Sequence, residues 1–214
     1  MEFLPSLPVL AAFTAAAIVI ILSPGPDMTL FLARTLGQGR GAGFASYLGA
    51  TAGLFVHTVF AAFGLSALLA ASADAFTAVK IAGALYLFWL AVDAIRNGSA
   101  LTLEKTGEKQ QNFRAVFMRG FWINLLNPKI ILFFVTFLPQ FVAAGDPDAA
   151  ARLVFFGLYF IALAFPVCSL LILMADRIAA WVRRSAWATR VLDWVFAGVL
   201  ATFAVRLLLE PDRN

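Results

Sequence analysis

The sequence predicts an all-α integral membrane protein with six transmembrane helices. The chain has 214 residues, of which 62% are hydrophobic and 13% are charged, whereas soluble domains average about 45–50% and about 25%. Six apolar runs are long enough to cross a bilayer, which takes about 20 residues of helix. This composition excludes a disordered chain and an ordinary soluble enzyme, and the single cysteine excludes a disulfide scaffold.

The six predicted spans follow one another along the whole chain. They cover residues 7–33, 41–71, 76–95, 120–144, 153–175 and 191–209. The longest connection is the polar segment 97–113, which we expect to be a cytoplasmic loop. The prediction is therefore a single transmembrane domain, 1–214, with no room for a separate soluble domain.

Basic residues alternate between the two sides of the predicted bundle. The connections after the first, third and fifth spans hold most of them, beginning with Arg34 and Arg40. Because cytoplasmic loops are enriched in Lys and Arg, this asymmetry predicts that these three loops are cytoplasmic and that both termini face outward. The net charge of +4 is explained in the same way, and no nucleic-acid partner is expected.

A short internal repeat relates the first and fourth spans. Pro26-Asp27-Met28-Thr29-Leu30-Phe31-Leu32 aligns with Pro128-Lys129-Ile130-Ile131-Leu132-Phe133-Phe134 at proline, leucine and phenylalanine. Each half has three spans, an odd number, so the halves would enter the membrane from opposite sides. This is the inverted-repeat plan of many secondary transporters, with repeats of about 1–96 and about 114–214.

The first span is interrupted at Ser23-Pro24-Gly25-Pro26-Asp27. Two prolines remove two backbone donors and glycine is permissive, so a continuous helix is not expected. A break in hydrocarbon must be buried in protein or line a cavity, and an acidic residue at such a place is usually functional. The alternative is a helix end at the interface, with Asp27 as the cap of the segment that starts at Met28.

The fourth span is interrupted at Asn124-Leu125-Leu126-Asn127-Pro128-Lys129. Pro128 cannot donate to the carbonyl of Asn124, and Lys129 lies deep in the predicted span. A buried ammonium is costly unless it finds a partner. The alternative is a lysine on a kinked helix whose side chain reaches the interface.

The two breaks carry opposite charges at equivalent repeat positions, which suits a zwitterion. Lys129, or amides at the break, could hold a carboxylate, while Asp27 and freed carbonyls could hold an ammonium. Without substrate, Asp27 could pair with Lys129 or take up a proton, and protonation would couple transport to a proton gradient. The candidate substrate- and ion-binding residues are Pro24, Gly25, Pro26, Asp27, Asn124, Asn127, Pro128 and Lys129.

Other polar residues in the spans are weaker candidates. His57, the only histidine, is either a proton relay or a packed histidine. Tyr86 and Gln140 are candidates for the same relay or for a cavity wall. Cys168 is interpreted as packing. The sequence contains no metal-ligand cluster and no nucleotide-binding loop, so we expect neither a metal nor a cofactor.

Gly49 and Gly53 form a small-residue face on the second span. Small residues let helices approach closely. This face could serve a homodimer or packing within the chain.

These motifs together resemble the LysE/RhtB amino-acid exporters. The first signature is Pro24-Gly25-Pro26-Asp27 followed by Arg34 and Arg40, and the second is Asn124-x-x-Asn127-Pro128-Lys129 followed by Leu138-Pro139-Gln140-Phe141. Ala82-Gly83-Ala84-x-Tyr86-Leu87-x-Trp89-Leu90 is similar to the third span of that family. The likeness covers the chain end to end. Many members have Asn where this chain has Asp27, a departure that bears on substrate or coupling.

The resemblance implies a bacterial inner-membrane exporter of amino acids such as threonine, homoserine, leucine or a basic amino acid, driven by the proton gradient. We therefore expect secondary active export by alternating access. The alternatives are a passive channel, an exporter of another small metabolite or ion, an intramembrane enzyme, and a structural membrane subunit, which would not need two polar breaks. The enzyme would have only Asp27, Lys129 and His57 for its chemistry.

Overall fold

The described part of the protein is entirely helical. In the computed structural model this part comprises residues 5–65, 112–142 and 146–184, with isolated positions between 77 and 96 and between 187 and 205. The α-helices are α1 (Leu7–Leu22), α2 (Pro26–Gln38), α3 (Arg40–Phe60), α6 (Phe113–Leu125), α7 (Pro128–Leu132), α8 (Ala149–Leu173) and α9 (Ala175–Arg184). The π-helical segments η1 (Ala61–Leu65) and η2 (Phe133–Phe137) extend α3 and α7, and the 3-10 turn η3 (Leu138–Phe141) follows η2. These ranges contain no strand, in agreement with the predicted fold class.

Four predicted spans have counterparts among these elements. Arg40–Gly64 and Ala149–Leu173 are each long and apolar enough to cross a membrane. The other two are bent pairs: α1 and α2 meet at 52°, and α6 meets the segment Pro128–Phe141 at 50°. The predicted breaks in the first and fourth spans are therefore present. The third and sixth predicted spans lie largely outside the described residues, so the six-helix count and the inverted repeat stay predictions.

Both breaks have the same local cause. Pro26 is the first residue of α2 and Pro128 is the first residue of α7. Proline suits this position, because its fixed φ is helical and the first turn of a helix needs no N–H donor. The preceding helices end at Leu22 and Leu125, four and three residues before the prolines. Asp27 and Lys129 consequently occupy the same position in the first turn of two different helices.

The boundaries of the predicted basic loops were wrong on two counts. The first loop was expected to hold Arg34 and Arg40, but Arg34 is buried in α2, and α2 and α3 are separated only by Gly39. Gly39 has φ of +89°, which favours glycine and allows a one-residue turn. The fourth span was expected to start at residue 120, but α6 starts at Phe113 and carries Arg114 and Arg119. A helix can continue past such residues because long basic side chains reach the polar interface.

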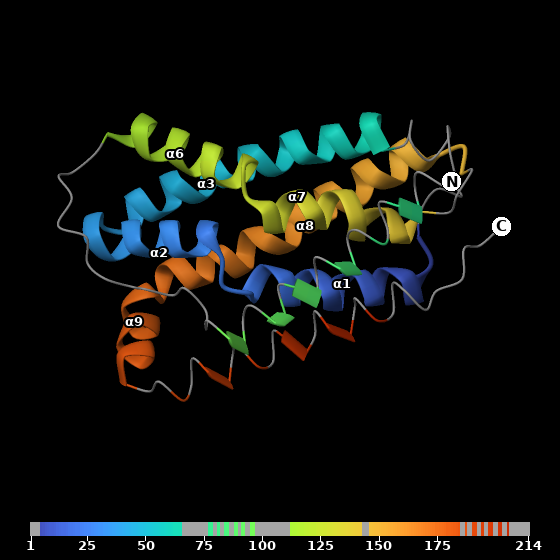
Figure 1. The fold of residues 1–214 in the computed structure, drawn as a ribbon. Helices are drawn as coiled ribbons and strands as arrows, with labels where there is room; N and C mark the ends of the chain where they lie inside the picture. The colour runs from blue at the N-terminus through green and yellow to red at the C-terminus, as the bar shows by residue number, and fades with distance from the viewer. Residues whose placement is uncertain are drawn as a thin grey trace.

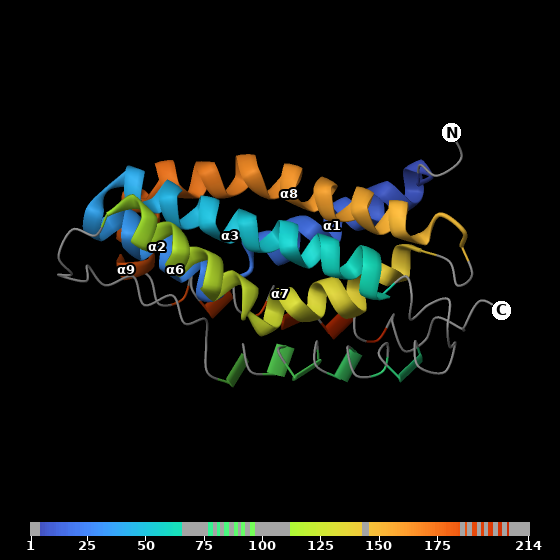
Figure 2. The same ribbon diagram turned by 90° about the horizontal axis from the view of Figure 1, so that it is seen from above.

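The broken helices divide the molecule into two ends. In Figure 1, α2 and α6 lie at one end and α1 and α7 lie at the other, and the long helices α3 and α8 run past both. Figure 2 shows the same arrangement from above. Helix α3 packs against α6, α2 and α8, and α1 packs against α8. The two breaks therefore face the middle of the long helices.

Glycines allow α3 and α6 to cross at very short range. A Cβ atom added at Gly49 would collide with the backbone carbonyl of Phe117, and one added at Gly120 would collide with that of Ser46. At Gly53 an added Cβ would lie 2.5 Å from Asn124 Oδ1. The Gly49 and Gly53 face therefore packs within the chain, which is one of the two alternatives that the sequence left open.

An aromatic cluster fills the end of the bundle at which α1 and α7 lie. Phe13 of α1 packs against Phe133 and Phe156, with ring centroids 6.3 and 4.7 Å apart. Phe133 also packs against Phe160 of α8 at 4.5 Å. These contacts connect α1, η2 and α8. They bury the segment that follows the second break, so the position of α7 is set by packing as well as by its own hydrogen bonds.

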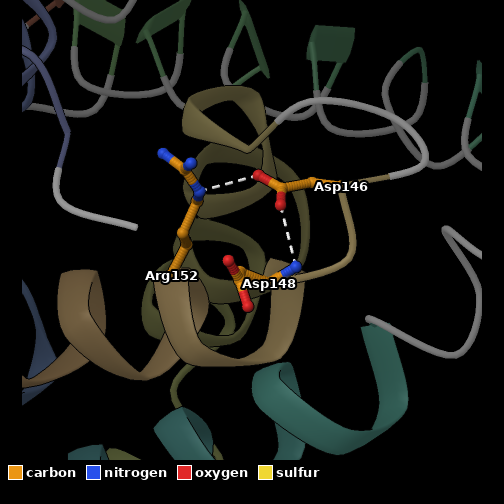
Figure 3. Close-up of polar contacts among 3 residues, drawn as sticks. All are labelled: Asp146, Asp148 and Arg152. Atoms are coloured by element: carbon orange, nitrogen blue, oxygen red, sulfur yellow. Dashed lines mark hydrogen bonds and ion pairs between the residues drawn. The ribbon is translucent and has the colours of Figure 1, made fainter. Parts of the chain in front are cut away.

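The start of α8 is held by a side-chain turn (Figure 3). Asp146 Oδ1 accepts a hydrogen bond from the backbone N–H of Asp148 at 2.8 Å, and Asp146 Oδ2 is 2.7 Å from Nε of Arg152. Asp148 is the N-cap residue, but its own side chain forms no capping hydrogen bond. Asp146 therefore closes a side-chain turn just before α8 and pairs with a residue in the first turn of that helix.

Candidate functional site

The two helix breaks meet at the carboxylate of Asp27. Its Oδ2 atom accepts hydrogen bonds from Nδ2 of Asn124 at 2.8 Å and from Nδ2 of Asn127 at 3.0 Å. Asp27 lies in the first turn of α2, where the helix dipole stabilises a negative charge. Its side chain bonds across to the second break and does not cap α2. The alternative of a simple interfacial cap is therefore not what the structure has.

Lys129 connects the second break to the first. Its Nζ donates to the backbone carbonyl of Ser23 at 2.8 Å, so the ammonium is turned toward the first break and not toward the interface. Lys129 also packs beside Gly25: a Cβ added at Gly25 would lie 3.5 Å from Lys129 Cδ and Nζ, which is ordinary van der Waals contact. Lys129 and Asp27 thus have separate partners across the same junction. An ammonium has three donors, and one of them is used within the part of the chain that the structure describes.

Asn127 organises the second break. Its Oδ1 atom accepts from the backbone N–H of Lys129 at 3.0 Å, as an N-cap does for α7. The same side chain donates to Asp27 through Nδ2. One amide therefore stabilises the start of α7 and binds the carboxylate of the opposite break.

The backbone carbonyl of Asn124 receives no helical hydrogen bond from Pro128, because proline has no N–H. Other groups take the place of that donor. It accepts from the backbone N–H of Asn127 at 3.0 Å and lies 3.4 Å from Nε2 of His57. His57 is buried on α3 and its ring is stacked on Phe134, with centroids 5.5 Å apart. The geometry places His57 beside the second break, as a neighbour of the backbone and not of the Asp27 carboxylate.

A cavity of about 60 Å³ lies at this junction, with room for a few water molecules. One side is polar and comes from the two breaks, while the other side is mainly apolar and comes from α3 and α8. The polar side is lined by Ser23, Gly25, Asp27, Asn124, Asn127 and Lys129. The apolar side includes Tyr47, Ala50 and Leu54 of α3 and Phe160, Ala164 and Cys168 of α8.

Three polar atoms of cavity-lining residues are buried without a hydrogen-bond partner among the described residues. They are Oδ1 of Asp27, Oδ1 of Asn124 and the hydroxyl oxygen of Tyr47. Burying such an atom unpaired costs about 1–3 kcal/mol, so a group that enters the cavity and pairs with these atoms would offset this cost. The first two are acceptors, and the lysine side chain of Lys129 lines the same cavity. The arrangement can therefore hold one cationic and one anionic group.

The structure brings most of the sequence-predicted site residues together. Gly25, Asp27, Asn124, Asn127 and Lys129 all line the cavity. Three prolines, Pro24, Pro26 and Pro128, shape the breaks and are not among the lining residues.

The further candidates are placed less favourably. Gln140 donates to the carbonyl of Thr136 and does not line the cavity. His57 contacts the backbone carbonyl of Asn124 and does not line the cavity. Tyr86 lies outside the described residues.

Two cavity residues were not predicted as such from the sequence. Cys168 was interpreted as packing, and it is buried in the hydrophobic core and also lines the cavity. Tyr47 was not singled out at all. It lies on the same face of α3 as Ala50 and Leu54, at helical spacing. A tyrosine in the interior of a transmembrane helix is the signal that could have pointed to it, because its hydroxyl needs a partner there.

Known proteins identify the family of this chain. The family model of the LysE type translocators matches residues 18–211. The chain belongs to the LysE type translocator family. A homoserine/homoserine lactone efflux protein of Salmonella typhimurium is 33% identical over 172 residues, which cover 80% of this chain and 82% of the relative. No solved structure matches the chain significantly.

Two further relatives cover almost the whole length of this LysE type translocator. An uncharacterised membrane protein of Pseudomonas aeruginosa is 32% identical over 210 residues, with 91% of this chain and 92% of the relative covered. A leucine efflux protein of Salmonella choleraesuis is 26% identical over 195 residues, with 91% and 92% covered. The predicted family is thereby confirmed. Together with the apolar helices, membership makes the chain a multi-pass membrane transporter and implies that it is not an enzyme.

Proposed function

We propose that this LysE type translocator exports a small amino acid from the cytoplasm as a secondary active, proton-coupled transporter. One observation carries the proposal: unpaired acceptors and a lysine ammonium line one cavity where two broken helices meet. A free amino acid is a zwitterion, which offers one ammonium and one carboxylate. The names of the homoserine and leucine efflux relatives support the same substrate class.

In this proposal the ammonium group of the substrate binds Oδ1 of Asp27 and Oδ1 of Asn124. Both atoms are acceptors, and Oδ2 of Asp27 is already held by the two asparagines. A charge-assisted hydrogen bond to a carboxylate is among the stronger ones available in a protein. The substrate would thus satisfy the two acceptors that are unpaired in its absence.

The carboxylate of the substrate binds the remaining donors of Lys129. Its ammonium already donates to the carbonyl of Ser23, which fixes its position at the first break. Because the two charged groups lie on different broken helices, a bound zwitterion connects both helices at once. Hinge motion at the two breaks then opens the site to either side of the membrane, which is the basis of alternating access.

Proton coupling is assigned to Asp27. In this proposal the carboxylate of Asp27 binds the ammonium group of the substrate while the site moves outward. It binds a proton while the empty site returns. Competition between these two cations for one carboxylate couples outward movement of the amino acid to inward movement of a proton. The proposal includes the bacterial inner membrane and an orientation with both termini outside. A homodimer also stays a proposal, and the Gly49 face is not its interface.

The test is uptake of radiolabelled amino acids into inside-out vesicles with an acidified lumen. Wild type should accumulate at least one amino acid against its gradient, and an uncoupler should abolish this. Asp27→Asn should lose gradient-driven accumulation. Asp176→Asn, at an exposed position at the start of α9, is the matched control and should transport as wild type does.

The alternatives give different results in the same assay. Downhill flux that ignores the proton gradient would identify a passive channel. Undiminished accumulation by Asp27→Asn would leave export standing and remove Asp27 from the coupling step. The absence of flux for every amino acid tested would show that the substrate is another metabolite or ion.

A further inference from the structure

The cavity has a third polar group that the zwitterion does not need. Tyr47 lies on the α3 side, across from the breaks, and is 3% exposed. Its hydroxyl lies near Thr51 and Cys168 but has no hydrogen-bond partner of standard geometry among the described residues. A buried hydroxyl without a partner is costly, and this one belongs to a residue that lines the cavity.

The ring of Tyr47 is held firmly in place. It packs edge-on against Phe31 of α2, with ring centroids 5.9 Å apart, and at a tilt against Phe165 of α8, with ring centroids 6.1 Å apart. Three helices therefore fix the ring, and the hydroxyl has little freedom to find another partner. A rigid aromatic ring with a polar end is well suited to orient a ligand.

The rest of the wall around Tyr47 is formed by small or apolar side chains. Ala50 follows it on α3, and Ala164 and Cys168 lie at helical spacing on α8. The two alanines leave space where larger residues would fill the cavity. None of these side chains is charged, so this wall suits an uncharged substrate side chain.

We infer that Tyr47, Ala50, Ala164 and Cys168 form a subsite for the side chain of the substrate, and that Tyr47 selects a short, uncharged side chain with a hydroxyl group. The inference rests on the proposed function, because the zwitterion must bind the breaks for its side chain to reach α3 and α8. The Tyr47 hydroxyl can donate to or accept from a substrate hydroxyl. An apolar side chain of the same size would leave it unpaired.

The experiment uses two isosteric pairs, homoserine with norvaline and threonine with valine. In each pair a hydroxyl replaces a methyl group at the same place. The ratio of initial uptake rates within each pair is measured in the vesicles described above. Wild type should favour the hydroxyl member of at least one pair by about 3- to 10-fold, the value of one net neutral hydrogen bond.

Tyr47→Phe removes only the hydroxyl and retains the ring between Phe31 and Phe165. It should bring the ratio close to one, while transport of the apolar member persists and shows that the variant is folded. Thr58→Val is the matched control. It deletes a buried hydroxyl on the same helix that donates to the backbone carbonyl of Leu54 and does not line the cavity, so the ratio should not change.

The outcomes separate this inference from the function on which it rests. Equal transport of both members of both pairs by wild type would overturn the subsite, and this arm needs no variant. A preference that persists in Tyr47→Phe would overturn the role of Tyr47. In both cases amino-acid export would stand. If wild type moved no amino acid, the proposed function would fail and the subsite with it.

Discussion

Replacing Gly49 with alanine tests the helix crossing that supports the site. Gly49 lies on α3 against the backbone of α6, where an added Cβ collides with the carbonyl of Phe117. Backbone atoms cannot turn aside as a flexible side chain can, so the two helices must separate. Overpacking of this kind costs about 3 kcal/mol at the upper end of its usual range. The higher helix propensity of alanine returns about 1 kcal/mol.

The expected net loss is therefore about 2 kcal/mol. For a chain of this length, each kcal/mol lowers the melting temperature by about 2–4 °C, so Gly49→Ala should melt about 4–8 °C below wild type. The measurement is thermal unfolding of the purified protein in detergent. Because α6 also carries Asn124, the same variant should transport poorly.

Gly41→Ala is the control for this prediction. Gly41 lies on the same helix, and an added Cβ there has no neighbour within 4 Å. Alanine should therefore leave the melting temperature unchanged or raise it by a few degrees, in line with a propensity gain of about 1 kcal/mol. Equal melting temperatures for Gly49→Ala and wild type, or an equal fall in both variants, would refute the close crossing of α3 and α6.

Further predictions concern the second break and the start of α8. Asn127→Ala removes the cap of α7 and a hydrogen-bond donor to the carboxylate of Asp27, so we expect vesicle uptake to be lost. Asn112→Ala removes the exposed cap of α6 and should cost only about 1 kcal/mol of stability and retain uptake. Lys129→Gln should raise the KM for amino acids at least 10-fold, since one charge-assisted hydrogen bond is worth about 1.5–3 kcal/mol, and an unchanged KM would remove the lysine from the binding site. Asp146→Ala should lower the melting temperature in detergent, because it removes the ion pair with Arg152 and a hydrogen bond worth about 1 kcal/mol, while Asp148→Ala, whose side chain caps nothing, should not.

Much of the fold class could be predicted from the sequence because lipid imposes strong local rules. Apolar runs of sufficient length predicted the membrane helices, and the Ser23–Asp27 and Asn124–Lys129 motifs predicted where two of them break. Proline acts on the backbone of its own helix, so its effect can be inferred without knowledge of the neighbours. Opposite charges at equivalent positions then indicated that the breaks belong to one site.

Charge was a less reliable guide to where helices end. Arg34, Arg114 and Arg119 were expected in loops, but all three lie within helices. A helix is held by its backbone hydrogen bonds, and a basic side chain interrupts none of them. The residue that ends α2 is Gly39, whose positive φ permits the turn.

The contacts that make the site depend on distances between segments far apart in the chain. The sequence by itself determined that the first and fourth spans are broken and that Asp27 and Lys129 lie at the two breaks. Only the tertiary structure decided that Asp27 is held by Asn124 and Asn127, that Lys129 is bonded to Ser23, and that Tyr47 and Cys168 complete the cavity. Helix breaks follow from local backbone chemistry, whereas these partners are selected by how closely α3, α6 and α8 pack, and glycines at their crossing set that distance.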